Sequence, residues 1–311
     1  MKKKLIEQLI CPSCLPAEYS LSATVEKEFE DDIIHGTLVC PGCKIGYPIS
    51  DSIAFLLPGS PLPMEDNKYE QDEVVASYMW SHYGDLIEDE MASEAYLNWA
   101  AELDETSGLG LDVGGAVGRF TFEMGNRCDL AVGIDNSVAF IRAARQLMKD
   151  RSLQVRLKEE GELEREVTFT LPPSFSTERV EFIVGDALRL PFRSRCASIV
   201  TSLNLVDKVP LPGQHLRELG RTAMTEQAQL IISDPFSWST EVAEPEEWLG
   251  GREEGIYGGR GLDNIRSILE NDDNGSTGGW RVEKSGHTWW KIRTHCNHYE
   301  MIRSRYLRAV R

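Results

Sequence analysis

The stretch LGLDVGGAVGRF, residues 109–120, constrains the fold of this 311-residue chain more than any other segment. A short apolar run ends in a glycine-rich turn, and AVGRFTFEMGNRC after it has the pattern of a helix. A second apolar run, DLAVGIDNS, completes a strand, helix and strand unit. Parallel strands joined in this way leave a ligand crevice at their carboxyl ends. We therefore predict an α/β fold in which this loop binds a nucleotide-like cofactor.

Asp112 distinguishes between the two cofactors that fit such a unit, NAD and S-adenosylmethionine. From Gly114 the loop runs Gly-Gly-Ala-Val-Gly, with Ala116 where a dinucleotide loop has the glycine that lets the backbone approach a pyrophosphate. The Asp112 carboxylate, beside a helix start, would repel a pyrophosphate but attract the α-ammonium group of S-adenosylmethionine. Asp135 ends the second strand about 20 residues after the loop, where an acid accepts the ribose hydroxyls of either cofactor. We predict S-adenosylmethionine rather than NAD.

A third acid follows a third strand. In VEFIVGDALRLPF, Asp186 is placed to accept the adenine amino group, although any one of the three acids is also explained as a loop Asp that caps a helix. Acids at three successive strand ends resemble class I methyltransferases, which implies a Rossmann-like fold with a seven-stranded, mostly parallel sheet. The expected cofactor-binding residues are Asp112, Gly114, Gly115, Ala116, Gly118, Asp135, Asn136, Asp186, Ala187 and Asn204.

Four of the seven cysteines form two Cys-x-x-Cys pairs about 25 residues apart, Cys11 with Cys14 and Cys40 with Cys43. Four thiolates suit tetrahedral zinc, and a site closed by four cysteines is structural. The alternative, a redox-active pair, needs a thioredoxin-like unit that we do not find around it. We predict a β-rich zinc ribbon that takes no part in the chemistry.

The stretch LVCPGCKIGYPISDSIAFLLP, residues 38–58, resembles the zinc-ribbon activator subunit of tRNA and release-factor methyltransferases. In that family the ribbon stabilises a methyltransferase partner, which here is either a second protein or the rest of this chain. We expect a zinc ribbon at residues 1–60, a linker and helices at 61–105, and the S-adenosylmethionine-dependent methyltransferase domain at 106–311. The linker prediction rests on the polar, acidic segment from Gly59 to Glu73.

The formal net charge of −17 argues against a nucleic-acid partner, because neutralising phosphates requires a basic surface. We find neither an apolar run of about 18 residues, as a membrane span needs, nor a signal-peptide core. Paired cysteines of the metal-binding type suit a reducing compartment. We expect a soluble, cytoplasmic protein whose substrate is a small molecule.

Segments from residue 69 to residue 251 resemble, in order, the C-terminal methyltransferase half of the ovothiol-biosynthesis enzyme. They include YEQDEVVASYMWSHYG, LDVGGAVGR, EGELEREVTFTLP, SLNLVDKV, SDPFSW and EEWLGG. The resemblance implies methylation of an imidazole nitrogen of a histidine or thiohistidine derivative. The zinc ribbon stands where that family has its iron-dependent sulfoxide synthase half, so this chain is not expected to install sulfur. The tail WWKIRTHCNHYE departs from the ovothiol pattern.

Methyl transfer from a sulfonium needs the nucleophile to be positioned, because the cofactor is already activated. We predict that Asn204 holds the nucleophile and that Asp207 accepts an imidazole N–H, although this loop is also explained as a cap for the next helix. The expected substrate-binding residues are Tyr78, His82, Tyr83, Asp234, Phe236, Trp238 and Trp248, with core or lid packing as the alternative. Two other functions stay open: an O- or C-methyltransferase of another small acid, and a ribbon-docked methyltransferase of a protein or RNA.

Overall fold

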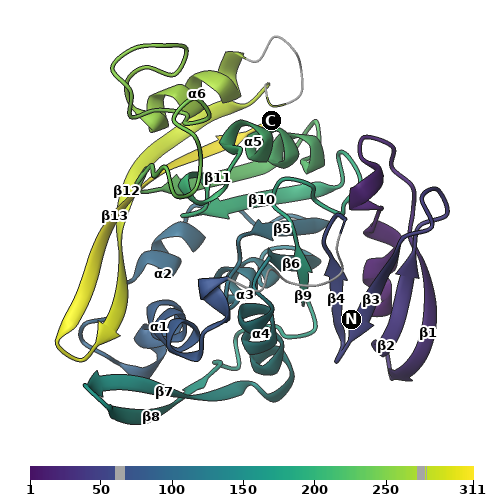
Figure 1. Ribbon diagram of the computed structural model, residues 1–311, viewed down its shortest axis with the longest axis horizontal. Coiled ribbons are helices and arrows are strands. Elements are labelled where there is room, and N and C mark those ends of the chain that lie inside the picture. Colours follow the sequence, from purple (N-terminus) through teal and green to yellow (C-terminus); the bar gives the residue numbers. More distant parts are fainter. Residues whose placement is uncertain (60–66, 272–276, 278) are drawn as a thin grey trace.

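The computed structural model describes residues 1–59, 67–271, 277 and 279–311. Residues 60–66, within the expected linker, lie outside the described part. Eleven strands form one sheet in the order β1-β2-β3-β4-β9-β6-β5-β10-β11-β13-β12, and β7 pairs with β8 in a separate hairpin. Figure 1 shows the sheet running from the N-terminal strands on the right to the long C-terminal hairpin on the left. None of the described helices is long and apolar enough to span a membrane.

Seven of these strands form what we call the methyltransferase sheet, after the class I methyltransferase fold that the sequence predicts. Neighbours among β9, β6, β5, β10 and β11 pair in parallel, β13 is antiparallel to β11, and β12 is antiparallel to β13. Their bounds are β5 Leu109–Val113, β6 Leu130–Asp135, β9 Val180–Gly185, β10 Ala197–Leu203, β11 Gln229–Asp234, β12 Arg281–His295 and β13 His298–Val310. The predicted Rossmann-like fold with a seven-stranded, mostly parallel sheet is confirmed.

The N-terminal strands continue the same sheet. They are β1 Ser22–Phe29, β2 Asp32–Val39, β3 Gly46–Ser50 and β4 Ile53–Leu56, preceded by the short helices η1 Lys3–Gln8 and η2 Pro12–Cys14. Strand β4 pairs in parallel with β9 through Phe55 with Val184 and Leu56 with Gly185. The β-rich N-terminal region therefore shares main-chain hydrogen bonds with the methyltransferase sheet.

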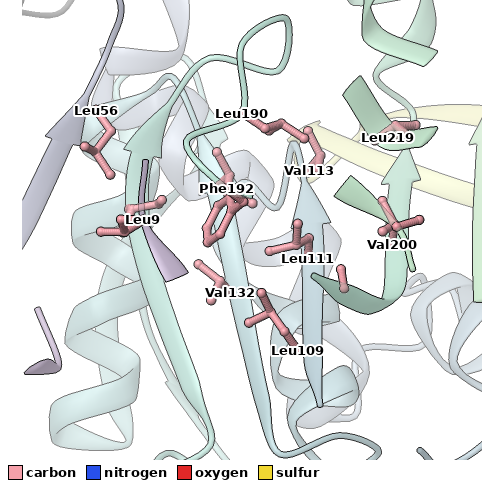
Figure 2. Close-up of a cluster of buried hydrophobic side chains, with 14 of the residues drawn as sticks. Leu9, Leu56, Leu109, Leu111, Val113, Val132, Leu190, Phe192, Val200 and Leu219 are labelled. Atoms are coloured by element: carbon pink, nitrogen blue, oxygen red, sulfur yellow. The ribbon is translucent and has the colours of Figure 1, made fainter. Parts of the chain in front are cut away.

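Helices cover both faces of the parallel strands. They are α1 Asp72–Tyr83, α2 Ala95–Ala100, α3 Arg119–Gly125, α4 Val138–Asp150, α5 Pro212–Thr222 and α6 Gly261–Asn271. Side chains alternate along each strand, so Leu109, Leu111 and Val113 pack toward the ribbon and α5. Figure 2 shows Leu9 of the N-terminal region beside Phe192, and Leu56 of β4 belongs to the same cluster. The ribbon and the methyltransferase sheet thus share one hydrophobic core.

Two hairpins extend from this framework. The polar insert before β9 forms β7 Ser152–Glu160 and β8 Leu163–Thr170; most residues of β8 are exposed, but Leu157 and Phe169 are buried in the core. In the other hairpin, β12 and β13 are longer than the strand β11 that the hairpin joins. Only Arg305–Val310 of β13 pairs with β11, and the preceding residues of β13 pair with β12 alone. The projecting part, residues 287–304, curves past α2 and α1 (Figure 1).

Candidate active site and metal centre

A cavity of about 1120 Å³ opens at the carboxyl ends of β5, β6, β9 and β10. Its volume exceeds the range of about 300–1,000 Å³ that single small-molecule pockets occupy, so there is room for a cofactor and an acceptor together. Eleven of the predicted site residues line it: Tyr78, His82, Asp112, Gly114, Gly115, Ala116, Asp135, Asn136, Asp186, Ala187 and Asn204. The predicted residues that do not are Gly118, Tyr83, Asp207, Asp234, Phe236, Trp238 and Trp248.

Asp112 ends β5 inside the protein, with 1% of its surface exposed. One carboxylate oxygen accepts a hydrogen bond from the hydroxyl of Thr121 at 2.7 Å, and the other accepts one from Thr201 at 3.0 Å. Burial raises the pKa of Asp112 to about 6, against the opposing effect of these two donors. A carboxylate has further lone pairs, so Asp112 can still accept a bond from a ligand in the cavity.

The glycine-rich loop follows Asp112 and lies against the cavity. Gly114 has φ +81°, Ala116 has φ +45° and Gly118 has φ +89°, so the loop passes three times through the left-handed region. A Cβ on Gly115 would lie 3.0 Å from the Asp112 carboxylate, which keeps this position bare. At Gly118 an added Cβ would lie 2.6 Å from the Phe182 ring. The absence of a side chain at this position therefore lets α3 approach the sheet.

Asp135 ends β6 and fixes the loop across the crevice. Its carboxylate accepts hydrogen bonds from the backbone N–H of Ala116 at 3.0 Å and of Ser137 at 2.9 Å. Burial raises its pKa to about 6, against these backbone donors. Asn136, the next residue, lines the same wall. The two acids at the ends of neighbouring strands therefore face one ligand space.

Asp186 and Ala187 follow β9 at the far side of the crevice. The Asp186 carboxylate accepts a hydrogen bond from the N–H of Leu188 at 2.8 Å, a turn that orients the side chain. Burial raises the pKa of Asp186. Arg189, one turn further along, donates to the carbonyl oxygens of Pro12 at 2.9 Å and Leu15 at 3.0 Å. The N-terminal region thus holds this cavity loop in place.

Asn204 follows β10 in a strained conformation. Its φ is +57°, in the left-handed region, and its N–H donates to the carbonyl of Ser233 at 2.6 Å. Its side-chain Oδ1 is buried and has no hydrogen-bond partner within the described part of the chain. A buried acceptor without a donor costs about 1–3 kcal/mol, so such an atom in a cavity wall marks a place where a ligand N–H fits.

Tyr78 and His82 lie one turn apart on α1 and line the cavity. The His82 Nε2 pairs with the hydroxyl of Tyr96 at 2.6 Å. Burial, and then the charge of Arg119, lower the pKa of His82 well below its usual range, so the ring is neutral at pH 7. Tyr83 points the other way: it is fully buried, and its hydroxyl donates to the Val117 carbonyl at 2.8 Å.

Several cavity residues come from segments to which sequence reasoning gave no site role. The projecting hairpin contributes Trp290, Ile292, Thr294, His295, Glu300 and Ile302, and the end of the expected linker contributes Asn67, Lys68, Tyr69 and Glu73. The alternating pattern in WWKIRTHCNHYE predicts strands but not that they leave the sheet. Within residues 67–73 of the linker, only the aromatic Tyr69 interrupts the polar pattern, which is a weak signal that this segment lines a cavity.

Asp207 and Asp234, predicted to meet the substrate, are instead buried behind the wall and brace two loops against each other. The Asp207 carboxylate accepts the N–H of Ser237 at 2.5 Å, and the Asp234 carboxylate accepts the N–H of Asp207 at 3.2 Å. Asp234 also accepts the N–H of Phe236 at 2.7 Å. Burial, and then the charge of Asp207, raise the pKa of Asp234 well above its usual range.

The three aromatic residues predicted for the substrate pocket pack with one another away from the cavity lining. Trp238 stacks on Trp248 with ring centres 6.3 Å apart, and Phe236 lies 6.1 Å from Trp238. The indole N–H of Trp248 donates to the Ala243 carbonyl at 3.0 Å. Gly251 and Gly261 lie against these rings, so this cluster shapes the loop between β11 and α6.

The four predicted zinc ligands come together as a cluster, with all four sulfur atoms within 4.8 Å of one another. The Cys11 and Cys43 sulfurs are 3.6 Å apart, and those of Cys14 and Cys40 are 3.8 Å apart. A tetrahedral zinc ion with Zn–S bonds of about 2.3 Å holds its sulfurs about 3.8 Å apart. The cluster fits zinc. Four cysteine sulfurs fill all four positions of a tetrahedral ion, as they do in structural zinc sites.

Two family models match the chain: the one described as Trm112p-like protein at residues 2–52, and the one described as methyltransferase domain at residues 111–226. No curated protein matches it. The N-terminal region is thus Trm112-like, as the resemblance implied, and the matched methyltransferase region contains the glycine-rich loop and the ends of β5, β6, β9 and β10.

Similar solved structures include the YcgJ protein from Bacillus subtilis, a SAM-dependent methyltransferase from Methanosarcina mazei, and a chain of the Haloferax volcanii Trm112 methyltransferase activator complex. They are 10%, 17% and 13% identical, with TM-scores of 0.44, 0.43 and 0.45. The matches cover 70%, 69% and 77% of this chain and 98%, 96% and 98% of those chains. The chain thus combines a region that matches the Trm112p-like model with a region that matches the methyltransferase-domain model, and the second region has a Rossmann-like fold.

Proposed function

We propose that the protein transfers the methyl group of S-adenosylmethionine to an imidazole nitrogen of a small histidine or thiohistidine derivative. The observation that carries this proposal is Asn204, which lines a cavity with room for two ligands and has a buried Oδ1 without a hydrogen-bond partner in the described part of the chain. A carbonyl oxygen aimed at an N–H orients a nitrogen nucleophile. It has no such use toward an anionic oxygen, which brings no proton.

The cofactor half of the cavity consists of the glycine-rich loop and the three acids. S-adenosylmethionine supplies an already activated methyl group when bound. Asp112 and the bare backbone at Gly114 and Gly115 would hold its amino-acid part, Asp135 its ribose, and Asp186 with Ala187 its adenine. The buried carboxylates are themselves fixed by hydroxyl and N–H donors, so they are oriented before the ligand arrives.

In the acceptor half, Asn204 accepts the N–H of the ring and thereby fixes its tautomer. A neutral imidazole that donates one N–H presents a lone pair at its other nitrogen, which is the nucleophile that methyl transfer requires. The aromatic side chains of Tyr78 and Trp290 suit a flat ring and exclude water. Asp207 has no contact with the cavity, so we now propose it as a positioning residue for the Asn204 loop.

We also propose the division into a zinc ribbon at residues 1–60, connecting helices at 61–105 and a catalytic domain at 106–311. The metal is proposed to be zinc, held by Cys11, Cys14, Cys40 and Cys43. Because β4 and Arg189 join this region to the catalytic domain, its methyltransferase partner is proposed to be the rest of this chain. Docking of a further protein remains the second candidate, favoured by the Trm112-like match and by the exposed Phe29 on the edge strand β1.

The experiment is calorimetric titration of the zinc-loaded protein with S-adenosylhomocysteine, then with 5-thiohistidine and histidine in its presence, followed by mass spectrometry of methylated products. Micromolar product binding and methylation of an imidazole nitrogen support the proposal. Cofactor binding without methylation of either compound overturns the imidazole assignment and leads to O- or C-nucleophiles and protein substrates. Asp135→Ala is expected to abolish cofactor binding, and unchanged affinity would contradict the loop assignment.

A further inference from the structure

The projecting part of the C-terminal hairpin is attached to the acceptor side of the cavity by specific bonds. The hydroxyls of Ser77 and Ser81 on α1 donate to the backbone carbonyls of Arg293 and Lys291 at 2.6 and 2.5 Å. On the other side, the Arg293 guanidinium pairs with Glu159 of β7 at 2.8 Å. Strand β12 is therefore fixed along the helix that carries Tyr78 and His82, and its inward residues form a wall of the cavity.

Aromatic rings from three elements surround Tyr78 in this half. Its ring centre is 6.0 Å from that of Trp290 on β12, 5.9 Å from that of His82, and 4.7 Å from that of Phe140 on α4. The rings of Tyr78 and Trp290 meet edge to face at 68°. Such a lining accepts a flat ring and offers few positions for a flexible aliphatic chain.

Two nitrogen atoms in this aromatic lining have no partner in the described ranges, namely Nε1 of Trp290 and Nδ1 of His82. Both residues are buried, with 6% and 4% of their surfaces exposed. Taking the Tyr96 hydroxyl as the donor to His82 Nε2, at 2.6 Å, leaves the proton of the neutral His82 ring on Nδ1. Both residues line the cavity, and each buried nitrogen without a partner is costly unless a local adjustment lets a ligand supply an acceptor.

We propose that Trp290 of the projecting hairpin and His82 of α1 form the acceptor subsite, and that they select a flat heteroaromatic molecule carrying a hydrogen-bond-accepting or anionic group, such as a ring sulfur or a carboxylate. The inference rests on the proposed function for the existence of a small-molecule acceptor, and it adds which residues recognise it. Asn204 Oδ1 then requires a donor from the same molecule. A purely hydrocarbon ring satisfies none of the three atoms.

The test compares Trp290→Phe, which removes the indole N–H and keeps an aromatic ring, with His82→Gln, whose side chain retains a partner for Tyr96 but no Nδ1 donor. Trp289→Phe is the matched control, because Trp289 directly precedes Trp290 in the same strand and is 44% exposed on the other face. Binding of 5-thiohistidine, histidine, nicotinate and phenylalanine is measured in the presence of S-adenosylhomocysteine, together with methyl transfer and with the affinity for S-adenosylhomocysteine alone.

We expect each active-site variant to weaken binding of the preferred heteroaromatic compound about 10-fold, as loss of one buried hydrogen bond does. Affinity for S-adenosylhomocysteine should stay unchanged, as should every property of the Trp289→Phe control. Methylation of thiohistidine or histidine with unaltered KM in both variants overturns this inference and leaves the proposed function intact. Binding of nicotinate alone, weakened in Trp290→Phe, upholds the inference and overturns the imidazole assignment. Phenylalanine binding as tight as that of every heteroaromatic compound, or no binding at all, overturns the subsite.

Discussion

The guanidinium of Arg119 donates two parallel hydrogen bonds to the carboxylate of Asp85, from Nη1 to Oδ1 at 2.7 Å and from Nη2 to Oδ2 at 2.9 Å. Arg119 starts α3 directly after the glycine-rich loop, while Asp85 lies in η4 (Gly84–Ile87), directly after α1. The same Nη1 also donates to the carbonyl of His82 at 2.9 Å. One buried side chain therefore links the glycine-rich loop to the helix that carries Tyr78 and His82.

Replacing this arginine is expected to damage both folding and acceptor binding. Arg119→Met leaves the Asp85 and Glu123 carboxylates without their buried partner, and breaking such a pair costs about 3–5 kcal/mol. The free energy of unfolding, measured by urea titration, should fall by an amount in that range. Arg142→Met, an exposed arginine on α4, serves as the control and should change it by less than about 0.5 kcal/mol. Equal effects of the two variants would contradict the linking role.

Affinity for S-adenosylmethionine should increase as the pH rises through about 6. Asp112 and Asp135 have pKa values raised to about 6 by burial, so both are largely protonated below that pH and ionised above it. The ligand carries an ammonium and a sulfonium group, which bind the ionised forms better. Calorimetry between pH 5 and pH 8 measures the change, and an affinity that is flat over this range would contradict the assignment.

The same two groups predict the opposite trend for the stability of the ligand-free protein. Their folded pKa values lie above the ordinary value of 3.8, so the folded state holds protons that the unfolded state has already released between pH 4 and pH 6. Their contribution is fully present below about pH 4 and is lost as the pH rises through 6. In Asp112→Asn this part of the pH dependence should shrink in urea titrations.

Removing the metal should weaken cofactor binding as well as unfold the N-terminal region. Arg189 in the Asp186 loop donates to carbonyl oxygens of Pro12 and Leu15, which flank the Cys14 ligand. Cys14→Ser, or chelation of the zinc, is therefore expected to lower the affinity for S-adenosylhomocysteine, with recovery when zinc is returned. Metal content and calorimetry provide the measurement. Cys196→Ser lies outside the sulfur cluster and should retain both metal and affinity.

Loss of the brace between the β10 and β11 loops should reduce turnover more than cofactor binding. Asp234→Ala leaves the N–H groups of Phe236 and Asp207 without their acceptor, at a cost of about 1–3 kcal/mol for each buried group. Asn204 sits on the same loop as Asp207, so kcat should fall while the affinity for S-adenosylhomocysteine changes little. Ser239→Ala removes an exposed turn bond and is the control. A variant with wild-type kcat would show that the brace is dispensable.

The sequence by itself determined those site residues that directly follow a strand. Asp112, Asp135 and Asp186 each follow an apolar run, and parallel strands bring their carboxyl ends to one edge, so their meeting in one cavity followed from order alone. The four cysteines were equally predictable, because each Cys-x-x-Cys turn presents two thiolates and one ion requires four. In both cases chemistry and spacing within short segments carry the information.

The tertiary structure alone decided which aromatic and acidic residues face the ligand. Trp290 enters the cavity because β12 and β13 run on beyond β11 and pack on α1, whereas Trp238 and Trp248 stack on each other in a loop. Asp207 turns inward to receive the N–H of Ser237, a contact across 30 residues. Sequence patterns specify which face of an element is apolar, but the direction in which an element leaves the sheet depends on long-range packing, and no local pattern encodes it.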